Sequence, residues 1–352
     1  PFIGPCRRLD VVGGAAVATI EVEGGYADVE VLLPAVASAA ERLCAPSKAS
    51  REQIDAVDAG LIARRTIADL LLEPQQVGLA ASPTVVGPDL RGVADTARAR
   101  RSATSIEQAL RVLDELPARA PVSNTPTPRP GVEIDPAAGR VWCVPDPTAG
   151  EPDAGLLHAA TTIAHSAGRK SLAVLAVSAP SARPDCADEV LFLSGATTPQ
   201  DWVAPLAARL AASPPHCVII DATNWGREVA ARLAARLGWG LVGDAVELTV
   251  DGDRVVAWKS AFSGQALVPI SSNSPTLLVT VKPGALVTSD EPTGVDRAEQ
   301  LGTIMTTSRS RVIYSPAHDV DPAQRELLRA RTLVVVGTGV PPDEYGLIDE
   351  FR

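Results

Sequence analysis

Blocks of apolar residues alternate with polar turns along the second half of the chain, and residues 216–248 show this pattern most completely. The run Cys217–Ile220 is continuously apolar, as expected for a strand that is covered on both faces of a parallel sheet. Thr223 or Asn224 can cap the helix that follows, and Gly238 can end it. The helix carries an apolar residue at every fourth position, namely Val229, Leu233 and Leu237. This stretch therefore predicts a strand, a polar elbow, a helix and a second strand.

The polar elbow Asp221–Asn224 has two interpretations. In open α/β sheets, ligands bind beyond the carboxyl ends of the strands, which is where this elbow is expected to lie. Short polar residues of this kind also serve simply as a capped turn between a strand and a helix. The residues of the elbow leave both interpretations open.

The same alternation of strand and helix patterns precedes this stretch. The strands and helices predicted there are "VWCVP", "AGLLHAATTIAHSAG", "KSLAVLAVSA", "EVLFLSG" and "QDWVAPLAARLAAS". Such alternation is typical of a sheet with helices on both faces. We therefore expect a doubly wound, three-layer α/β domain over residues 140–320.

An internal repeat connects the two halves of the chain. Residues 9–39 resemble residues 240–258 followed by 274–286. Each copy offers a glycine-containing turn, a strand, an acidic-glycine hairpin turn, a return strand and a strand that follows a proline. The hairpin turns aligned in this way are Glu23-Gly24-Gly25 and Asp251-Gly252-Asp253. One structural unit is expected to occur twice.

The two copies are preceded by very different lengths of chain. The predicted strands and helices of residues 140–239 come before the second copy, whereas eight residues come before the first. The first copy therefore resembles the back half of a domain, with an exposed sheet edge where further strands would pair. The chain also begins without methionine and stops within a predicted helix. We expect a fragment of a longer polypeptide.

A proline-rich stretch separates the two copies. Residues 104–116 have the pattern of an amphipathic helix, and Ser105 and Gln108 are spaced as a capping box. The five prolines of residues 117–131 then predict an extended linker where two separate subunits could have been joined. The domains expected from these features are 1–116, a linker at 117–137, 138–325, and the start of a further domain at 326–352.

Composition excludes several classes of function. A net charge of −10 argues against nucleic acid as a partner, because phosphate binding needs a clustered cationic surface. No apolar run has the roughly 18 to 20 residues of a membrane span, and no signal peptide is recognisable, so a cytoplasmic protein is expected. The 5 cysteines are scattered without a CxxC pair, which predicts packed thiols and no metal site.

The second half of the chain resembles a known family. "DATNWGREVAARLAARLGWGLVGDAVEL", followed by "AFSGQALVPISSNSPTLLVTVKPGAL", is similar to the first domain of the α subunit of electron-transfer flavoproteins. In that family a strand and a loop lead into an "FGR" helix, and a glycine-rich "GNA" turn precedes a "VTVRPGAF"-like strand. Asn224-Trp225-Gly226-Arg227 and Gly264-Gln265-Ala266 stand at these places. The similarity covers residues 140–320 and implies an adenine nucleotide hydrolase-like fold.

The first copy resembles the C-terminal half of the β subunit of the same family. "LPAVASAAERLCAPSKASREQIDAVDAGLIARR" parallels its "LPAVV" strand and the loop after it, and "ASPTVVGPDLRGV" parallels its proline-rich tail. The match runs over residues 9–116. The whole chain thus resembles a partial β subunit fused to an α subunit that is truncated at the start of its FAD-binding domain.

The resemblance implies electron transfer and no substrate-transforming activity, so no catalytic residue is expected. Members of the family take electrons from dehydrogenases, including those of fatty acid β-oxidation, into FAD and pass them to a quinone reductase or another acceptor. The FAD lies mainly in the second α domain, which would begin at residues 331–352. An AMP lies in the N-terminal half of β, which this sequence does not contain.

The resemblance also assigns site residues. Gly337-Thr338-Gly339 stands where the family often has Gly-Arg-Gly, and we expect it to contact the cofactor, although threonine cannot clamp a pyrophosphate as arginine does. A lone glycine turn of this kind is also compatible with a plain strand-to-helix turn. Pro46 and Arg51 lie in the partner-recognition loop, and Arg51 replaces an apolar anchor of some relatives. The dehydrogenase partner is therefore expected to differ.

Two other classes of function stay open at this stage. A nucleotide-binding α/β regulatory domain without redox activity fits the same layered fold. A hydrolase or transferase is a third alternative, because His318-Asp319 and the many serines could form a triad, but no GxSxG elbow accompanies them. The five tryptophans are scattered and are expected to serve packing.

Overall fold

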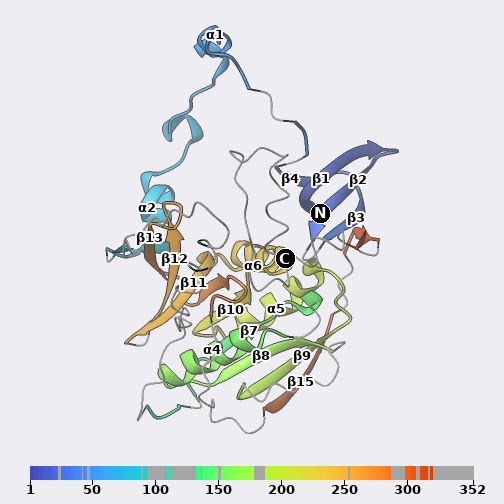
Figure 1. The fold of residues 1–352 in the computed structure, drawn as a ribbon. Coiled ribbons are helices and arrows are strands. Elements are labelled where there is room, and N and C mark those ends of the chain that lie inside the picture. The colour runs from blue at the N-terminus through green and yellow to red at the C-terminus, as the bar shows by residue number, and fades with distance from the viewer. Residues whose placement is uncertain are drawn as a thin grey trace.

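A computed structural model shows a mixed α/β protein (Figure 1), and its described residues form two β-sheets, one of 11 strands and one of six. Both sheets are assembled from segments that are distant in the sequence. The structure describes residues 1–22, 25–41, 43–45, 48–88, 90–92, 108, 111, 132–135, 137–149, 152–177, 187–252, 254–286, 298–306, 310–315 and 318–319.

Parallel strands form the main part of the larger sheet. Their order across the sheet is β15-β9-β8-β7-β10-β14-β11. Every residue of β7, β8, β10 and β14 is buried, which is why these segments read as continuous apolar runs in the sequence. The strands are β7 (Val141–Val144), β8 (Ser171–Ala176), β9 (Glu189–Ser194), β10 (Cys217–Asp221), β11 (Leu241–Asp251), β14 (Leu277–Val281) and β15 (Glu299–Met305).

Helices cover both faces of this sheet. Helix α4 (Ala154–Ser166) packs with alternate strand residues such as Cys143 and Ile219 in one apolar core. Helices α5 (Pro199–Ala212) and α6 (Asn224–Leu237) pack with the intervening residues, Val144 and Ile220 among them, in a second core. Helices therefore lie on both faces of the larger sheet. No described helix is long and apolar enough to cross a membrane.

The helix boundaries follow from local chemistry. Asp153 accepts a hydrogen bond from the amide of Leu156 and so caps α4. A capping box formed by Thr198 and Asp201 begins α5. Gly238 ends α6 in the left-handed conformation at φ 67°, as the sequence predicts.

The larger sheet continues through antiparallel strands. Strand β12 (Arg254–Ala261) pairs with β11, and β13 (Ala266–Ser272) pairs with β12. Two short strands from the N-terminal part of the chain, β5 (Thr84–Val86) and β6 (Arg91–Gly92), then pair with β13. Segments from both halves of the sequence thus share one sheet.

The smaller sheet has the order β16-β3-β2-β1-β4, and β17 also pairs with β3. Strands β1 to β3 form an antiparallel meander, and β4 runs parallel to β1. Alternate residues, including Ile3, Cys6, Ala18 and Val29, build a third apolar core. The strands are β1 (Phe2–Val12), β2 (Ala15–Val22), β3 (Gly25–Leu32), β4 (Val36–Ala39), β16 (Val312–Tyr314) and β17 (His318–Asp319).

The internal repeat is present, and the structure corrects its alignment. Strands β1, β2, β3 and β4 have the pairing of β11, β12, β13 and β14. The register break between Cys6 and Arg8 in β1 recurs between Ala245 and Glu247 in β11. We call β1–β4 the first copy and β11–β14 the second copy.

The counterpart of the turn at Gly252 is therefore Gly13-Gly14, not Glu23-Gly24-Gly25. Each of these turns joins the first two strands of its copy. The sequence alignment was wrong by one hairpin because consecutive glycine turns in a meander look alike. The first copy also begins at Phe2, several residues earlier than predicted.

Short strands from each half of the chain close the outer edge of the sheet in the other half. Strand β16 pairs Tyr314 with Val29 of β3, and β5 pairs Val86 with Ile270, the counterpart of Val29 in β13. The amide of Ser315 donates to the Asp28 carbonyl at 2.9 Å, and that of Gly87 to the Pro269 carbonyl at 2.8 Å. We call residues 83–92 and 310–319 the two arms. Each arm lies in one of the domains expected from the sequence and pairs with a strand of the other.

A long segment between β4 and β5 extends away from the body of the protein (Figure 1). We call residues 48–82 the projecting segment. It contains only short helices, and nearly all of its described side chains are exposed. The short helices of the projecting segment are α1 (Arg51–Asp55), the 3₁₀ turns Ala59–Leu61, Ala68–Leu70 and Pro74–Gln76, and α2 (Gly78–Ala81). A further 3₁₀ turn, Pro147–Ala149, follows β7.

Several expectations fall outside the described residues. Of the helix predicted at 104–116, only Gln108 and Arg111 are described, and both are helical. The linker at 117–131 and the start of the further domain at 326–352 are not among the described residues.

Candidate functional site

The elbow after β10 is held by a network of buried polar groups. The Asp221 carboxylate accepts from the backbone amide of Asp146 at 2.8 Å, and the Thr223 hydroxyl donates to the Asp146 carboxylate at 2.6 Å. Thr148 donates to the same carboxylate through its amide at 2.7 Å and its hydroxyl at 2.6 Å. The network fixes the end of β10 against the end of β7. The elbow thus sits at the carboxyl edge of the sheet, as predicted.

Thr223 is the cap of α6, which decides between the two candidates. Its hydroxyl accepts from the amide of Gly226 at 3.0 Å. The Asn224 side chain turns instead to the smaller sheet and donates through Nδ2 to the Glu21 carbonyl at 3.1 Å. The elbow is therefore also a joint between the two sheets.

Gly226 allows the helix to approach the strand closely. A Cβ atom built on Gly226 would overlap the carbonyl oxygen of Asp221 and lie 3.1 Å from Cγ2 of Ile220. Glycine is thus required by the close approach of the two backbones, although no left-handed conformation is involved. This contact explains the glycine of the Asn224-Trp225-Gly226-Arg227 motif.

A cavity of about 290 Å³ lies between this elbow and the smaller sheet. Asp146, Thr197 and Trp225 line it from the carboxyl edge of the larger sheet, and Glu21 and Tyr314 line it from the other side. A cavity at the carboxyl ends of parallel strands, with convergent polar groups, is the default position for a ligand site.

The electrostatics of this cavity are acidic. Burial raises the pKa of Glu228, against the opposing effect of Arg232. Burial, helped by the charge of Glu228, also raises the pKa of Tyr314 to about 12. Asp146 is 2% exposed and accepts hydrogen bonds as a carboxylate does.

The pyrophosphate of FAD does not fit this cavity. Its described lining residues include the acids Glu21, Asp146 and Glu228 and no lysine, arginine or histidine. The Asp146 carboxylate already accepts from the hydroxyl of the residue that caps α6, where a phosphate would otherwise be attracted. A dianionic group would face carboxylates without a compensating cation. The elbow therefore serves as a structural joint, and no chemical step is assigned to it.

The residues predicted to touch the cofactor, Gly337, Thr338 and Gly339, lie outside the described residues. The predicted pair His318-Asp319 forms β17 and pairs with Tyr26 and Gly25 of β3. Among the described residues, no group of His, Cys, Asp and Glu side chains is arranged to hold a metal ion.

The projecting segment carries Arg51, one of the two predicted partner-recognition residues. Arg51 is the first residue of α1 and forms an exposed ion pair with Asp55 at 3.1 Å, while Ser50 and Gln53 form the capping box of this helix. Pro46 lies outside the described residues. Arg51 is therefore engaged in an ion pair on its own helix.

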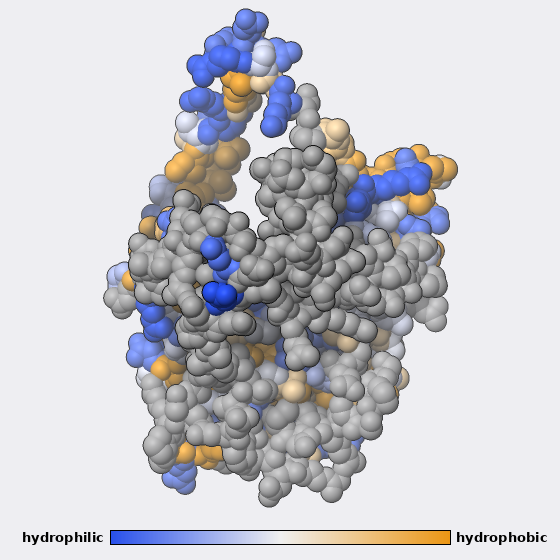
Figure 2. Space-filling view, in the orientation of Figure 1, coloured by the Kyte–Doolittle hydropathy of each residue, from blue (hydrophilic) through white to orange (hydrophobic). Residues whose placement is uncertain are grey.

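Apolar side chains of the same segment were missed by the sequence reasoning. Ile54 is 56% exposed one turn from Arg51, and Leu61 and Leu71 are 78% and 92% exposed. Figure 2 shows hydrophobic and hydrophilic residues mixed along this projection. These side chains are accessible for contact with another protein. The signal in the sequence was the apolar residues at 54, 57, 61 and 62 between charged ones.

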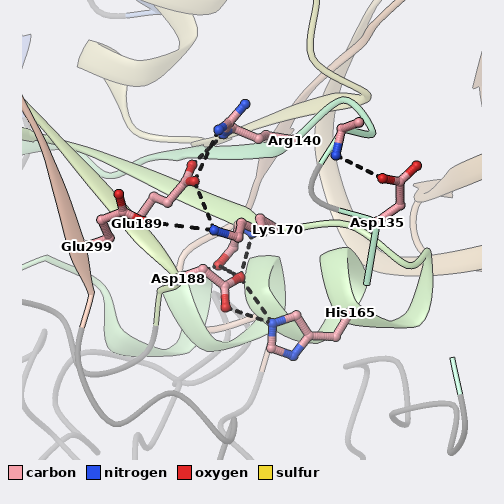
Figure 3. Close-up of polar contacts among 9 residues, drawn as sticks. Asp135, Arg140, His165, Lys170, Asp188, Glu189 and Glu299 are labelled. Atoms are coloured by element: carbon pink, nitrogen blue, oxygen red, sulfur yellow. Dashed lines mark hydrogen bonds and ion pairs between the residues drawn. The ribbon is translucent and has the colours of Figure 1, made fainter. Parts of the chain in front are cut away.

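A second polar cluster lies at the opposite, amino edge of the larger sheet (Figure 3). The Glu189 carboxylate receives two hydrogen bonds from Arg140 and lies 3.4 Å from Nζ of Lys170. The hydrogen bond to Glu189 raises the pKa of Arg140. Nζ of Lys170 also lies 3.8 Å from Glu299 of β15. These ion pairs connect the starts of neighbouring strands.

His165, Ser171 and Asp188 in this cluster resemble a hydrolase triad only in composition. Nε2 of His165 lies 3.0 Å from Asp188, and the Ser171 hydroxyl donates to the same carboxylate at 2.9 Å, so the histidine faces the acid and not the serine. Ser171 is 1% exposed. A buried serine without a base is not a nucleophile, and the cluster is structural.

Asp188→Asn is expected to destabilise the protein in a pH-dependent way. Burial alone would raise the pKa of Asp188, but hydrogen bonds from His165 and Ser171 outweigh it and lower the pKa. The carboxylate therefore stabilises the fold above its unfolded pKa of about 3.9, and this contribution is lost as pH falls through the lower folded value. Urea unfolding should show a loss of about 1 to 2 kcal/mol at pH 7 that shrinks below about pH 4.

Asp135→Asn is the matched control, because Asp135 lies at the same edge but accepts only one described side-chain hydrogen bond, from the amide of Ala137 at 2.8 Å. It should change stability little at either pH. An equal loss for Asp188→Asn at both pH values would contradict the charge-dependent role.

Comparisons with known proteins find similarity to one family over the central part of the chain. Residues 148–304 match the model of the electron transfer flavoprotein domain. The chain is 30% identical over 134 residues to electron transfer flavoprotein subunit alpha of Bacillus subtilis (strain 168), over 37% of this chain and 40% of that protein. It is 30% identical over 169 residues to the same subunit of Mycobacterium leprae (strain TN), over 48% of this chain and 50% of that protein.

Over a shorter stretch the similarity is higher. The chain is 41% identical over 81 residues to the alpha subunit of Mycobacterium tuberculosis (strain ATCC 25618 / H37Rv), over 23% of this chain and 24% of that protein. The chain thus spans half or less of the length of these relatives. The comparisons support the electron transfer flavoprotein family for the domain that contains the elbow.

Proposed function

We propose that this chain is part of an electron carrier of the electron-transfer flavoprotein type. The observation that supports the proposal is the match of residues 148–304, which spans the parallel strands β8 to β11 and β14, α4 to α6 and the elbow. In this proposal residues 138–325 are the doubly wound, adenine nucleotide hydrolase-like first domain of an α subunit. Residues 1–116 are a partial β-like domain, and residues 326–352 begin the FAD-binding domain.

The flavin would carry the redox chemistry, and the described residues would position it. FAD would be held mostly by the domain that begins at 326–352, with Gly337-Thr338-Gly339 as candidate contacts, and AMP would belong to the N-terminal half of a β subunit. The described chain then contributes a rigid support, without a protein acid or base and without a transformed substrate. The acidic cavity beside the elbow is consistent with this role, because it does not fit a pyrophosphate.

The carrier would work in the cytoplasm. It would take electrons from a dehydrogenase, such as one of fatty acid β-oxidation, and pass them to a quinone reductase or similar acceptor. The projecting segment is the proposed dehydrogenase contact. Pro46 and Arg51 are the residues assigned by resemblance, and exposed Ile54 adds an apolar group beside Arg51. Some relatives have a single apolar anchor at this place, whereas this chain has a charged residue beside an apolar one. The donor dehydrogenase would therefore differ from the donor of those relatives.

Ile54→Ser is expected to weaken the dehydrogenase contact without changing the fold. Loss of an apolar anchor at an interface costs about 1 to 2 kcal/mol, which corresponds to about a 5- to 30-fold rise in the KM for the carrier. The measurement is the rate of flavin reduction by the dehydrogenase in the complete carrier. Leu79→Ser is the control, because Leu79 is 93% exposed on the same segment but lies on α2. Equal effects of both changes would remove the assignment to α1.

The test of the proposed function is reconstitution. The chain is co-expressed with the reading frames that flank its gene, and the purified assembly is examined for flavin absorbance and for bleaching by a dehydrogenase and its substrate. A yellow, reducible assembly is expected, whereas the 352-residue chain alone should be colourless. A colourless assembly that binds ATP would instead favour a nucleotide-binding regulatory domain, the alternative function.

A further inference from the structure

We propose that the joint between the two sheets responds to pH: the smaller sheet closes on α6 when Glu228 is protonated, and it separates from α6 when Glu228 is ionised. Glu228 of α6 and Gly4 of β1 both line the cavity beside the elbow, so the carboxyl group stands where the helix meets the smaller sheet. The proposal concerns the described residues alone and is independent of the proposed electron transfer.

The described polar contacts across this joint are few. Asn224 donates through Nδ2 to the Glu21 carbonyl at 3.1 Å, and Gln200 donates through Nε2 to the Phe2 carbonyl at 3.5 Å. The guanidinium of Arg232 lies 5.9 Å from the centre of the Phe2 ring. Beside Asn224 the two sheets are separated by the cavity of about 290 Å³ instead of being closely packed. A single buried charge can therefore decide whether the joint closes.

Acidic groups from several elements surround Glu228. Glu21 of β2 and Asp146, which follows β7, line the same cavity. Asp201 of α5 is 1% exposed, and its Oδ1 atom has no hydrogen-bond partner among the described residues. The phenol of Tyr314 in β16 also lines the cavity, and the charges of Glu228 and Asp201 both act on it. An ionised Glu228 thus adds a negative charge where other acids already converge.

The two arginines of α6 nearest to Glu228 in the sequence are already engaged. Arg232, one turn further along the helix, donates through Nε to the Glu228 carboxylate at 2.8 Å. Arg227, the residue before Glu228, forms an ion pair with Asp244 at 2.9 Å. Arg232 is therefore the one cation of this pair that offsets the charge of Glu228.

Burial outweighs this ion pair. The side chain of Glu228 is 13% exposed, and burial raises its pKa although Arg232 opposes the effect. A carboxyl group with a raised pKa stabilises the folded state below its unfolded value of about 4.3, and this contribution is lost as pH rises through the folded value. Ionisation also attracts water, which the polar cavity can admit. The closed joint should therefore weaken as pH rises toward neutrality and above.

Quenching of tryptophan fluorescence by acrylamide measures the opening of the joint. Trp225 lines the cavity and is 7% exposed, so separation of the smaller sheet would uncover it. Its signal is the difference between each protein and the same protein with Trp225→Phe. Acrylamide is neutral, so its approach does not depend on the charge of the cavity. The quenching constant of Trp225 should rise by about twofold or more between about pH 5 and about pH 8.

Glu228→Gln removes the titrating group and keeps its size. The quenching constant should then stay low at both pH values, because no charge appears at the joint. Glu30→Gln is the matched control, since Glu30 is an exposed acid of the smaller sheet outside the lining of the cavity. This variant should keep the rise of the natural protein. Circular dichroism at both pH values checks that each variant folds.

Arg232→Gln supplies a second, independent test if Glu228→Gln folds poorly. Arg232 lowers the pKa of Glu228, so its removal should move the rise in quenching to higher pH. A variant that only loosened the packing of α6 would instead raise quenching at every pH.

Three outcomes would overturn the proposal. The first is a quenching constant of Trp225 that does not change with pH in the natural protein. The second is a rise that persists in Glu228→Gln or stays at the same pH in Arg232→Gln, because another group would then be titrating. The third is a rise accompanied by loss of the circular dichroism signal, because unfolding would then expose Trp225. The measurements need no flavin or electron transfer, so their failure leaves the proposed function untouched.

Discussion

Gly226→Ala is expected to lower the free energy of unfolding by about 3 kcal/mol or more, among the largest effects of any single methyl group in this protein. The added Cβ atom would overlap the carbonyl oxygen of Asp221, which is backbone and cannot rotate away. Relief would require α6 to shift from β10, and that shift would disturb the hydrogen bond of Thr223 to Asp146. Chemical denaturation followed by circular dichroism measures the change.

Gly243→Ala is the matched control for this prediction. A Cβ atom on Gly243 would have only the hydroxyl of Thr280 nearby, at 4.0 Å, and the backbone of Gly243 is not left-handed. The variant should stay within about 1 kcal/mol of the natural protein. If Gly226→Ala were equally harmless, the close approach of helix and strand would not be essential.

Val229→Asp is expected to prevent folding or to destabilise it by about 4 kcal/mol or more. Val229 is 0% exposed, in the core that α6 forms against the larger sheet. An unpaired carboxylate there must either stay charged in an apolar environment or take up a proton, and both are unfavourable. The variant should appear in the insoluble fraction or unfold at much lower denaturant concentration.

Ala231→Asp is the control that separates the cost of burying a carboxylate from the low helix propensity of aspartate. Ala231 is exposed two residues further along the same helix. The same carboxylate at that position should cost less than about 1 kcal/mol, mainly through helix propensity. Comparable losses at both positions would show that α6 does not pack as described.

The elbow and its helix could be predicted from the sequence because their signals are local. The apolar run of β10, the fourfold spacing of the stripe and the terminal glycine each reflect neighbours within a few residues. The choice of cap was beyond these signals. Thr223 and Asn224 have similar capping chemistry, and their roles differ only because Asn224 meets the Glu21 carbonyl of the other sheet.

The arms could not be predicted for the opposite reason. Strands β5, β6, β16 and β17 have only two or three residues each, which is too short for a period-2 pattern. Their pairing partners lie far away in the sequence, so no local turn fixes their register. The missed hairpin alignment has a related cause, since only the pairing of whole strands distinguishes one glycine turn from the next.

The candidate site likewise combines features that local sequence predicts with features that depend on distant parts of the chain. Its position at the carboxyl edge follows from strand order, and the sequence placed it there. Its acidic lining combines Glu21, which comes from the other sheet, with Asp146 and Glu228 of the larger sheet's half. The exposure of Ile54 likewise depends on the absence of packing around the projecting segment.

Because the arms are exchanged, each half of the chain depends on the other to complete its β-sheet. The arm at 83–92 is continuous in sequence with the first copy but completes the sheet of the second, where Arg91 lies 3.6 Å above the ring of Trp258 and pairs with Glu247 at 2.7 Å. The arm at 310–319 makes the reverse crossing. A protease cut within 117–131 would therefore leave two chains clasped through both sheets. The two pieces should then stay associated through strand pairings that are already present in the uncut chain.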